Sequence, residues 1–135
     1  AKAKKADFTE AELLTADLRR ADLRDARLDA VLLERGFLSG ADLRGATLEG
    51  AEILATDLGG ALFDSNTRLD RARFSGSYLQ VSDLSQADLS EAQLNQLFGD
   101  GSVILPDGLD RPGFWPAEPL LTADFKARRR ATFPE

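Results

Sequence analysis

Residues 16–30 read ADLRRADLRDARLDA, three five-residue units in which a small residue precedes a leucine by two positions. The same spacing extends outward from Ala6 to Leu94 and gives 18 units, with one interruption. The central residue is Leu in 14 units, Phe in 3 and Ile in 1, and Ala lies two places before it in 12 units. The fold must therefore accommodate a period of five.

Neither an α-helix nor a continuous strand accommodates this period. Five residues turn a helix by roughly 500°, so successive leucines lie about 140° apart and form no stripe. In a strand, an odd repeat would place successive leucines on opposite faces. A short extended side followed by a turn lets the small and the large residue point the same way. Repetition predicts a closed, narrow coil whose backbone groups pair between coils about 4.8 Å apart.

The last place of each unit is expected to form a corner. Glycine occupies this place in five units, which suits corners with unusual backbone dihedrals: Gly40, Gly45, Gly50, Gly60 and Gly76. Phe63 is followed six residues later by Leu69, so one residue is extra. We place it at Asn66 and expect a bulged corner, because Asn tolerates left-handed geometry.

Four units have the form Ala-Asp-Leu-x-x, at residues 16–20, 21–25, 41–45 and 87–91. They resemble the pentapeptide-repeat family, and the resemblance covers about two thirds of the chain. It implies an all-β solenoid, a right-handed quadrilateral β-helix with four units to a coil. About 4.5 coils, or roughly 22 Å of helix, would follow at that ratio. The resemblance also suggests a bacterial origin and dimerisation through the C-terminal segment.

Three parts are expected along the chain. Residues 1–5 form a disordered or truncated N-terminus, residues 6–98 the β-helix, and residues 99–135 a capping segment. That segment is turn-rich at first, with one short strand at residues 103–105, and a short helix follows from about Glu118 to Ala131. The chain does not start with Met, which leaves open a domain of a larger, membrane-attached protein.

Composition limits the chemistry. The chain has no Cys and no His, which removes thiol chemistry, the usual general base and the commonest transition-metal ligand. A net charge of −6 argues against direct nucleic-acid binding, and no apolar run approaches the ~20 residues of a membrane span. We therefore expect no enzyme activity, cofactor, metal site or transmembrane segment, and favour a cytoplasmic location.

The outward residues are the candidates for a partner surface. On a four-sided coil Asp22, Asp42 and Asp83 share an acidic column, which is either a solvated face or a surface for a basic partner. A flat column supplies too few convergent oxygens for a calcium site. Apolar residues occupy other outward positions: Leu14, Leu32 and Leu54 on one side, Phe37 and Tyr78 on the next. They would dock the C-terminal segment, a second copy or a partner.

The C-terminal segment is too apolar for a free tail. Together with Leu97 and Phe98 at the end of the coil, its candidate cap or dimer-interface residues are Phe114, Trp115, Leu120, Leu121 and Phe125. They would cap the open end of the solenoid, where strand edges are otherwise exposed, or form a homodimer interface. One helix could serve both purposes.

A non-enzymatic structural or protein-interaction module, with an unknown partner, is the predicted function. The resemblance implies one alternative: a DNA mimic that acts on a type II topoisomerase such as gyrase. A duplex of about 22 Å carries roughly 13 negative charges, whereas residues 1–97 hold 17 acidic and 12 basic residues. The rod is weakly charged for a mimic, although a tail-to-tail dimer would double its length.

Overall fold

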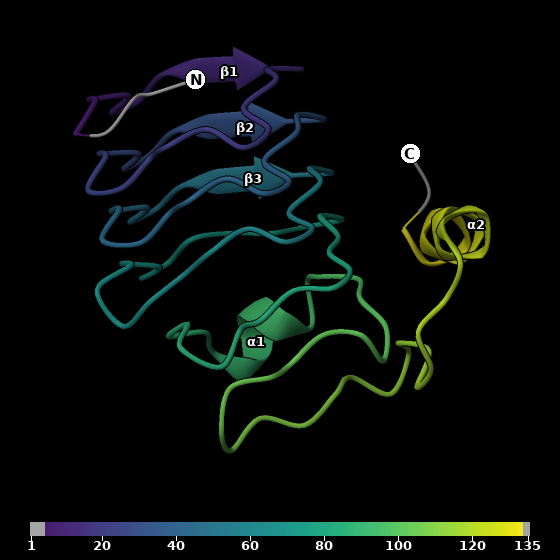
Figure 1. Cartoon of the computed structure of the whole chain (residues 1–135). Helices are drawn as coiled ribbons and strands as arrows, with labels where there is room; N and C mark the ends of the chain where they lie inside the picture. Colours follow the sequence, from purple (N-terminus) through teal and green to yellow (C-terminus); the bar gives the residue numbers. More distant parts are fainter. Residues whose placement is uncertain (1–4, 134–135) are drawn as a thin grey trace.

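The computed structural model describes residues 5–133, so most of the expected disordered or truncated N-terminus lies outside the described residues. Successive turns of the chain stack in parallel (Figure 1). Three strands form one sheet in the order β1 (Glu12–Leu14), β2 (Leu32–Glu34) and β3 (Glu52–Leu54). Leu13 pairs with Leu33, and Leu33 with Ile53, so one coil takes 20 residues, or four units.

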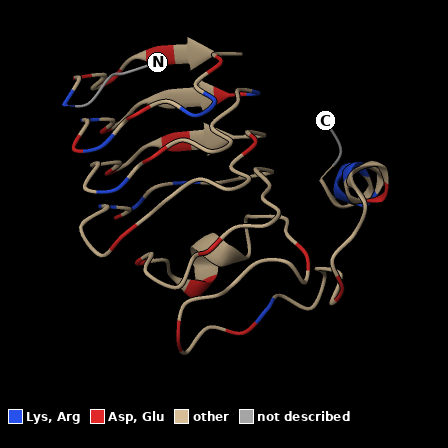
Figure 2. Cartoon of the chain, viewed as in Figure 1, with Lys and Arg blue, Asp and Glu red and all other residues tan. Residues whose placement is uncertain are grey.

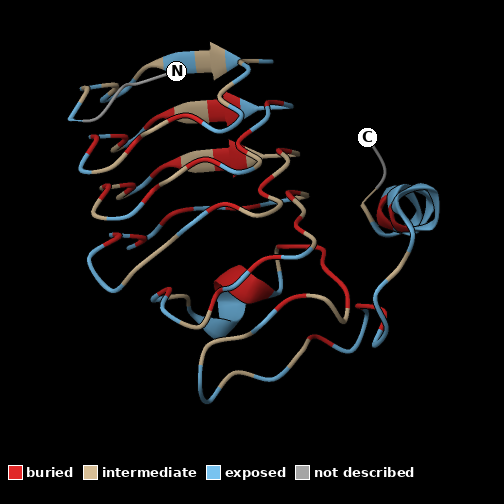
Figure 3. Ribbon diagram, in the orientation of Figure 1, coloured by how far each residue is buried: buried red, intermediate tan, exposed pale blue. Residues whose placement is uncertain are grey.

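Each coil has four sides, which we number by their central residues. The first side carries Leu28 and Leu48, the second Leu33 and Ile53, the third Leu38 and Leu58, and the fourth Leu23 and Leu43. All of these side chains are buried, as are most of the small residues two places before them. Figure 3 shows the buried residues concentrated along the coils and the exposed ones at the turns. The small residue leaves room for one large side chain per side.

Most corners within residues 5–133 use left-handed backbone geometry. The Ala26 N–H donates to the Leu23 carbonyl at 3.1 Å, and Asp25 between them has φ of 60°. Positive φ at this place is typical of a type II turn. The five corner glycines have φ between 67° and 73°, as their dihedral freedom predicts. Ten corners hold other residues: Lys5, Glu10, Thr15, Arg20, Asp25, Ala30, Arg35, Ala55, Arg71 and Val81.

We expect Val81→Gly to raise the free energy of unfolding by about 1 kcal/mol. Val81 is 79% exposed with φ of 50°, so a β-branched side chain is strained there and makes little packing contact. Gly50→Ala is the converse, because nothing lies within 4 Å of the added Cβ and φ is +67°. Gly50→Ala should lower the free energy of unfolding by a similar amount. Urea denaturation measures both; a loss in Val81→Gly would refute the argument.

The extra residue is accommodated at the corner of residues 64–66. The Gly45 N–H donates to Asp64 Oδ1 at 3.1 Å, whereas the matching Asp25 N–H is bound by the Arg44 carbonyl. The Asp64 carboxylate thus replaces a backbone acceptor that the bulge displaces. Asn66 is not among the residues with positive φ, so the expected left-handed Asn is wrong. Later pairs have a register of 21: Thr47 with Arg68, Glu52 with Arg73 and Asp57 with Tyr78.

The five-residue pattern of the sequence continues through Leu94, but the prediction that the last unit forms a side of the coil is wrong. Helix α1 (Glu91–Leu94) takes its place. The Ser90 hydroxyl accepts the Gln93 N–H while the Gln93 side chain accepts the Ser90 N–H, a capping box that stabilises a helix start. Single bridged pairs continue the stack beyond α1: Tyr78 with Phe98 and Asp83 with Ile104.

The segment after the last coil packs back onto the solenoid. Residues 105–121 run past the end of the stack, and α2 (Thr122–Thr132) lies beside it (Figure 1). The Trp115 indole N–H donates to the Leu97 carbonyl at 2.8 Å, and its ring covers Gly99. Helix α2 begins later than expected because the Leu120 N–H donates to the Asp100 carboxylate and the chain there is extended. None of the helices in residues 5–133 is long and apolar enough to cross a membrane.

Candidate interaction surface

The acidic column lies on the fourth side. Asp22 pairs with Asp42, and Asp42 with Leu62, so these three residues stack on successive coils. Asp83 pairs onward with Ile104. The two stacked aspartates are the part of the expected column that the structure brings together.

Arginines interleave with the stacked aspartates. Arg24 binds Asp22 at 2.8 Å and lies 3.8 Å from Asp42, while Arg44 binds Asp42 at 2.6 Å. The hydrogen bond from Arg44 is the main cause that lowers the pKa of Asp42. Such exposed pairs add little stability, but they cancel most of the column's negative charge. Figure 2 shows basic and acidic residues mixed along these coils, and no three acidic residues in positions 5–133 converge as metal ligands.

The leucines of the second side form no continuous patch. Leu14, 52% exposed, is in register with Glu34 and Leu54, so a glutamate separates the two leucines. Leu32 belongs to the neighbouring column, between Glu12 and Glu52. The expected apolar side is therefore an alternation of apolar and acidic residues.

The third side carries the aromatic residues. Its outward column runs Asp17, Phe37, Asp57, Tyr78 and Phe98. Phe37 is 41% exposed, and the Arg19 guanidinium lies 5.5 Å from the centre of its ring. The same guanidinium donates two hydrogen bonds to the Asp17 carboxylate and lowers the pKa of Asp17 to about 2.

Helix α2 packs against this aromatic column. The Phe125 ring lies 5.0 Å from the Phe98 ring and 6.3 Å from the Tyr78 ring, between centres. Arg129 is buried, with its guanidinium 4.4 Å from the centre of the Tyr78 ring and a hydrogen bond to the Gly76 carbonyl at 3.1 Å. Arg129 is not among the contact residues expected from the sequence, so its place in this interface was missed.

Most candidate residues of the C-terminal segment are used within the chain. Four of them are buried: Leu97, Phe98, Trp115 and Phe125. Leu120 is half-buried, and Phe114 meets Phe133 edge-on at 5.9 Å. Leu121 is 79% exposed at the start of α2.

Asp100 was also missed, although it joins three segments. It is fully buried and accepts hydrogen bonds from the Gln80 side chain at 2.8 Å, the Leu120 N–H at 2.9 Å and Ser102. Burial by itself raises the pKa of Asp100, but the hydrogen bonds from Ser102, Gln80 and Leu120 outweigh it and hold that pKa below its usual value. Nothing in the Gly-Asp-Gly turn distinguishes this residue in the sequence.

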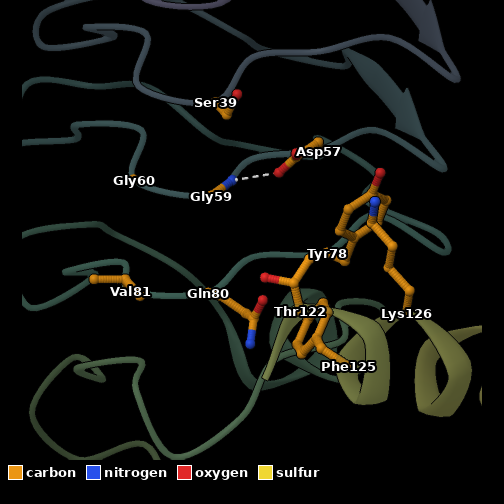
Figure 4. A pocket seen from close by; sticks show the side chains of 10 residues that line it. All are labelled: Ser39, Asp57, Gly59, Gly60, Tyr78, Gln80, Val81, Thr122, Phe125 and Lys126. Atoms are coloured by element: carbon orange, nitrogen blue, oxygen red, sulfur yellow. Dashed lines mark hydrogen bonds between the residues drawn. The ribbon is translucent and has the colours of Figure 1, made fainter. Parts of the chain in front are cut away.

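A groove of about 370 Å³ lies where α2 meets the third side. Figure 4 shows Ser39 on one coil, Asp57 and Gly59 on the next, and α2 on the opposite wall. Asp57 accepts the Gly59 N–H at 2.9 Å. The full lining is Ser39, Asp57, Gly59, Gly60, Tyr78, Gln80, Val81, Thr122, Phe125 and Lys126.

Comparisons with known proteins agree on the repeat. The family model for pentapeptide repeats matches 8 copies, over residues 1–35, 26–64 and 65–97. No curated protein matches the chain.

Several solved structures are similar. A pentapeptide-repeat protein of the Arabidopsis thaliana thylakoid lumen is 25% identical over 70% of this chain and 65% of its own, with a TM-score of 0.43. One from Nostoc PCC 7120 is 23% identical over 82% and 74%, with a TM-score of 0.42. QnrB1, a plasmid-mediated fluoroquinolone resistance protein, is 19% identical over 97% and 62%, with a TM-score of 0.43.

The chain thus spans less than two thirds of the Arabidopsis protein and of QnrB1. The family model covers well over half of the chain, and the parallel coils have four five-residue units each. This chain therefore belongs to the pentapeptide-repeat family, whose members are right-handed quadrilateral β-helices.

Proposed function

We propose that this chain is a protein-interaction module without catalytic activity. The observation that carries the proposal is that each unit has separate inward and outward residues. Two residues fill the core, and the side chains beside them are held outward by pairing with the coils above and below. A surface fixed in this way needs little ordering when a partner binds, which lowers the entropic cost of association.

The chemistry of the outward carboxylates supports this proposal over an enzyme. Asp17 and Asp42 are hydrogen-bonded by arginines, and the pKa of each is lowered. A carboxylate with a lowered pKa is a weak proton acceptor at neutral pH. Their arrangement suits recognition of charged groups rather than proton transfer.

A topoisomerase partner is the alternative, and the charge pattern weighs against it. A DNA mimic needs an uncompensated column of negative charge. On the fourth side Arg24 and Arg44 sit beside Asp22 and Asp42, so the charges alternate instead. The interaction-module proposal does not require gyrase as the partner.

A homodimer through the C-terminal segment also remains a proposal. It would have to use Leu121 and Phe114, which are exposed, because Phe98, Trp115 and Phe125 are already packed inside the chain. We likewise propose a cytoplasmic location.

Affinity capture with side-specific variants tests the function. Four variants each add an arginine to one side: Thr47→Arg on the first, Leu14→Arg on the second, Ser39→Arg on the third and Ser85→Arg on the fourth. We expect a partner protein that the wild-type chain retains and that one variant binds about tenfold more weakly, while all four variants keep the wild-type melting temperature. Equal capture by every variant would contradict the proposal. A captured topoisomerase lost only with Ser85→Arg would establish the alternative.

A further inference from the structure

We infer that the groove on the third side binds an amphipathic helix of a partner protein, lying alongside α2 over Ser39, Asp57 and Gly59. The partner helix carries one large apolar residue and a lysine or arginine one turn away. This inference rests on the proposed function and deepens it, because it names the side and the kind of partner.

Helix α2 shows how the third side holds a helix. Its Phe125 ring packs between Tyr78 and Phe98, which are paired neighbours in the outward column. Its Arg129 guanidinium covers the Tyr78 ring. One aromatic anchor and one cation four residues later thus dock α2 across two adjacent coils.

The coil spacing places a second helix at a favourable distance. Phe37 and Asp57 lie in the same column, two coils from Tyr78 and Phe98 respectively. Coils about 4.8 Å apart put two coils at about 10 Å, and packed helices prefer axes 8–10 Å apart. A helix over Phe37 and Asp57 would therefore contact the solenoid and α2 at the same time.

The lining of the groove defines the partner's chemistry. Ser39 and Gly59 are small, so a helix can approach the coil closely, and Phe37 on the same coil as Ser39 offers an exposed ring. Asp57 accepts one hydrogen bond from Gly59 and has further acceptor capacity for a cation. On the opposite wall, Thr122 and Lys126 come from α2 (Figure 4).

The sequence of α2 already has the required pattern, since Phe125 precedes Arg129 by four residues. A synthetic peptide with the sequence of residues 120–133 is therefore the probe. It is titrated into the full-length ¹⁵N-labelled chain. We expect shift changes at the Ser39, Gly59 and Gly60 amides, and about tenfold weaker binding when Phe125 of the peptide is replaced by alanine.

A matched pair of variants locates the site. Ser39→Arg should weaken peptide binding about tenfold, because it fills the groove and repels the basic peptide. Ser85→Arg makes the same change on the fourth side and should leave the binding unchanged. The solution mass of each variant is measured at the same concentrations.

Three results would overturn the inference. The first is no shift change at millimolar peptide. The second is change confined to Tyr78 and Phe98, which would mean that the peptide displaces α2. The third is a wild-type dimer that Ser39→Arg dissociates, which would make the occupant a second copy. If one of these results is found while affinity capture identifies a partner on another side, the helix site is refuted and the proposed function is retained. If the peptide binds the groove but no partner is captured, the proposed function is refuted and the helix site is retained.

Discussion

Replacing Leu43 with alanine is expected to lower the free energy of unfolding by about 3 kcal/mol. Leu43 is fully buried on the fourth side, and the small partner on its own side is Ala41. The coils on either side are held by backbone hydrogen bonds, such as the Leu43 N–H to the Leu62 carbonyl at 2.9 Å. They cannot collapse into the space, so most of the cavity cost persists.

Leu14→Ala is the matched control, because Leu14 is 52% exposed on the second side. We expect it to change the free energy of unfolding by less than about 0.5 kcal/mol. Urea denaturation followed by circular dichroism measures both variants. Equal losses would show that inward and outward positions are not distinguished as the coil requires.

The coil could be predicted from the sequence because each unit repeats the same local pattern of residues. A small residue and a large one, two apart, point the same way only on a short extended side, and Ala41 with Leu43 is one of many such pairs. The number of sides and the handedness came from the family resemblance. The register of 20 in the pairing of Leu33 with Ile53 agrees with four sides.

The two errors in the predicted fold, at the last unit and at the insertion, have local causes. The unit around Leu94 matches the repeat, yet Ser90 and Gln93 satisfy each other's backbone groups and start a helix. At the insertion, the five-residue spacing predicted where the extra residue lies but not the conformation of the corner that accommodates it. Asp64 closes that corner with its side chain, and a count of spacings does not reveal such a bond.

The surface was predictable by position but not by partner. The period identified Phe37 and Tyr78 as outward residues, and the structure puts them in one column. That α2 would cover Tyr78 and leave Phe37 exposed depends on contacts across about 50 residues of chain. Asp100 was missed for the same reason, since Gln80 and Leu120, two of its donors, lie 20 residues away on either side.

Replacing Asp100 with alanine is expected to release α2 from the third side and to cost about 3 kcal/mol of stability. The Gln80 amide and the Leu120 N–H would lose their shared acceptor in a buried place. Limited trypsin digestion measures the release, because Arg128 and Arg130 on α2 are exposed. Asp107→Ala, an exposed aspartate in the same segment, should be cleaved at the wild-type rate.

The same contact should make α2 docking sensitive to acid. The pKa of Asp100 is lowered by its hydrogen bonds, so the stability it contributes is complete above its unfolded pKa of roughly 4 and disappears as the pH falls through the lower folded value. The wild-type chain should therefore become sensitive to pepsin, a protease that is active in acid, on transfer to buffers below that range. Asp100→Ala should lack this particular transition and be sensitive at neutral pH. An Asp100→Ala chain as resistant as wild type at neutral pH would mean that Phe125 and Arg129 hold α2 without the carboxylate.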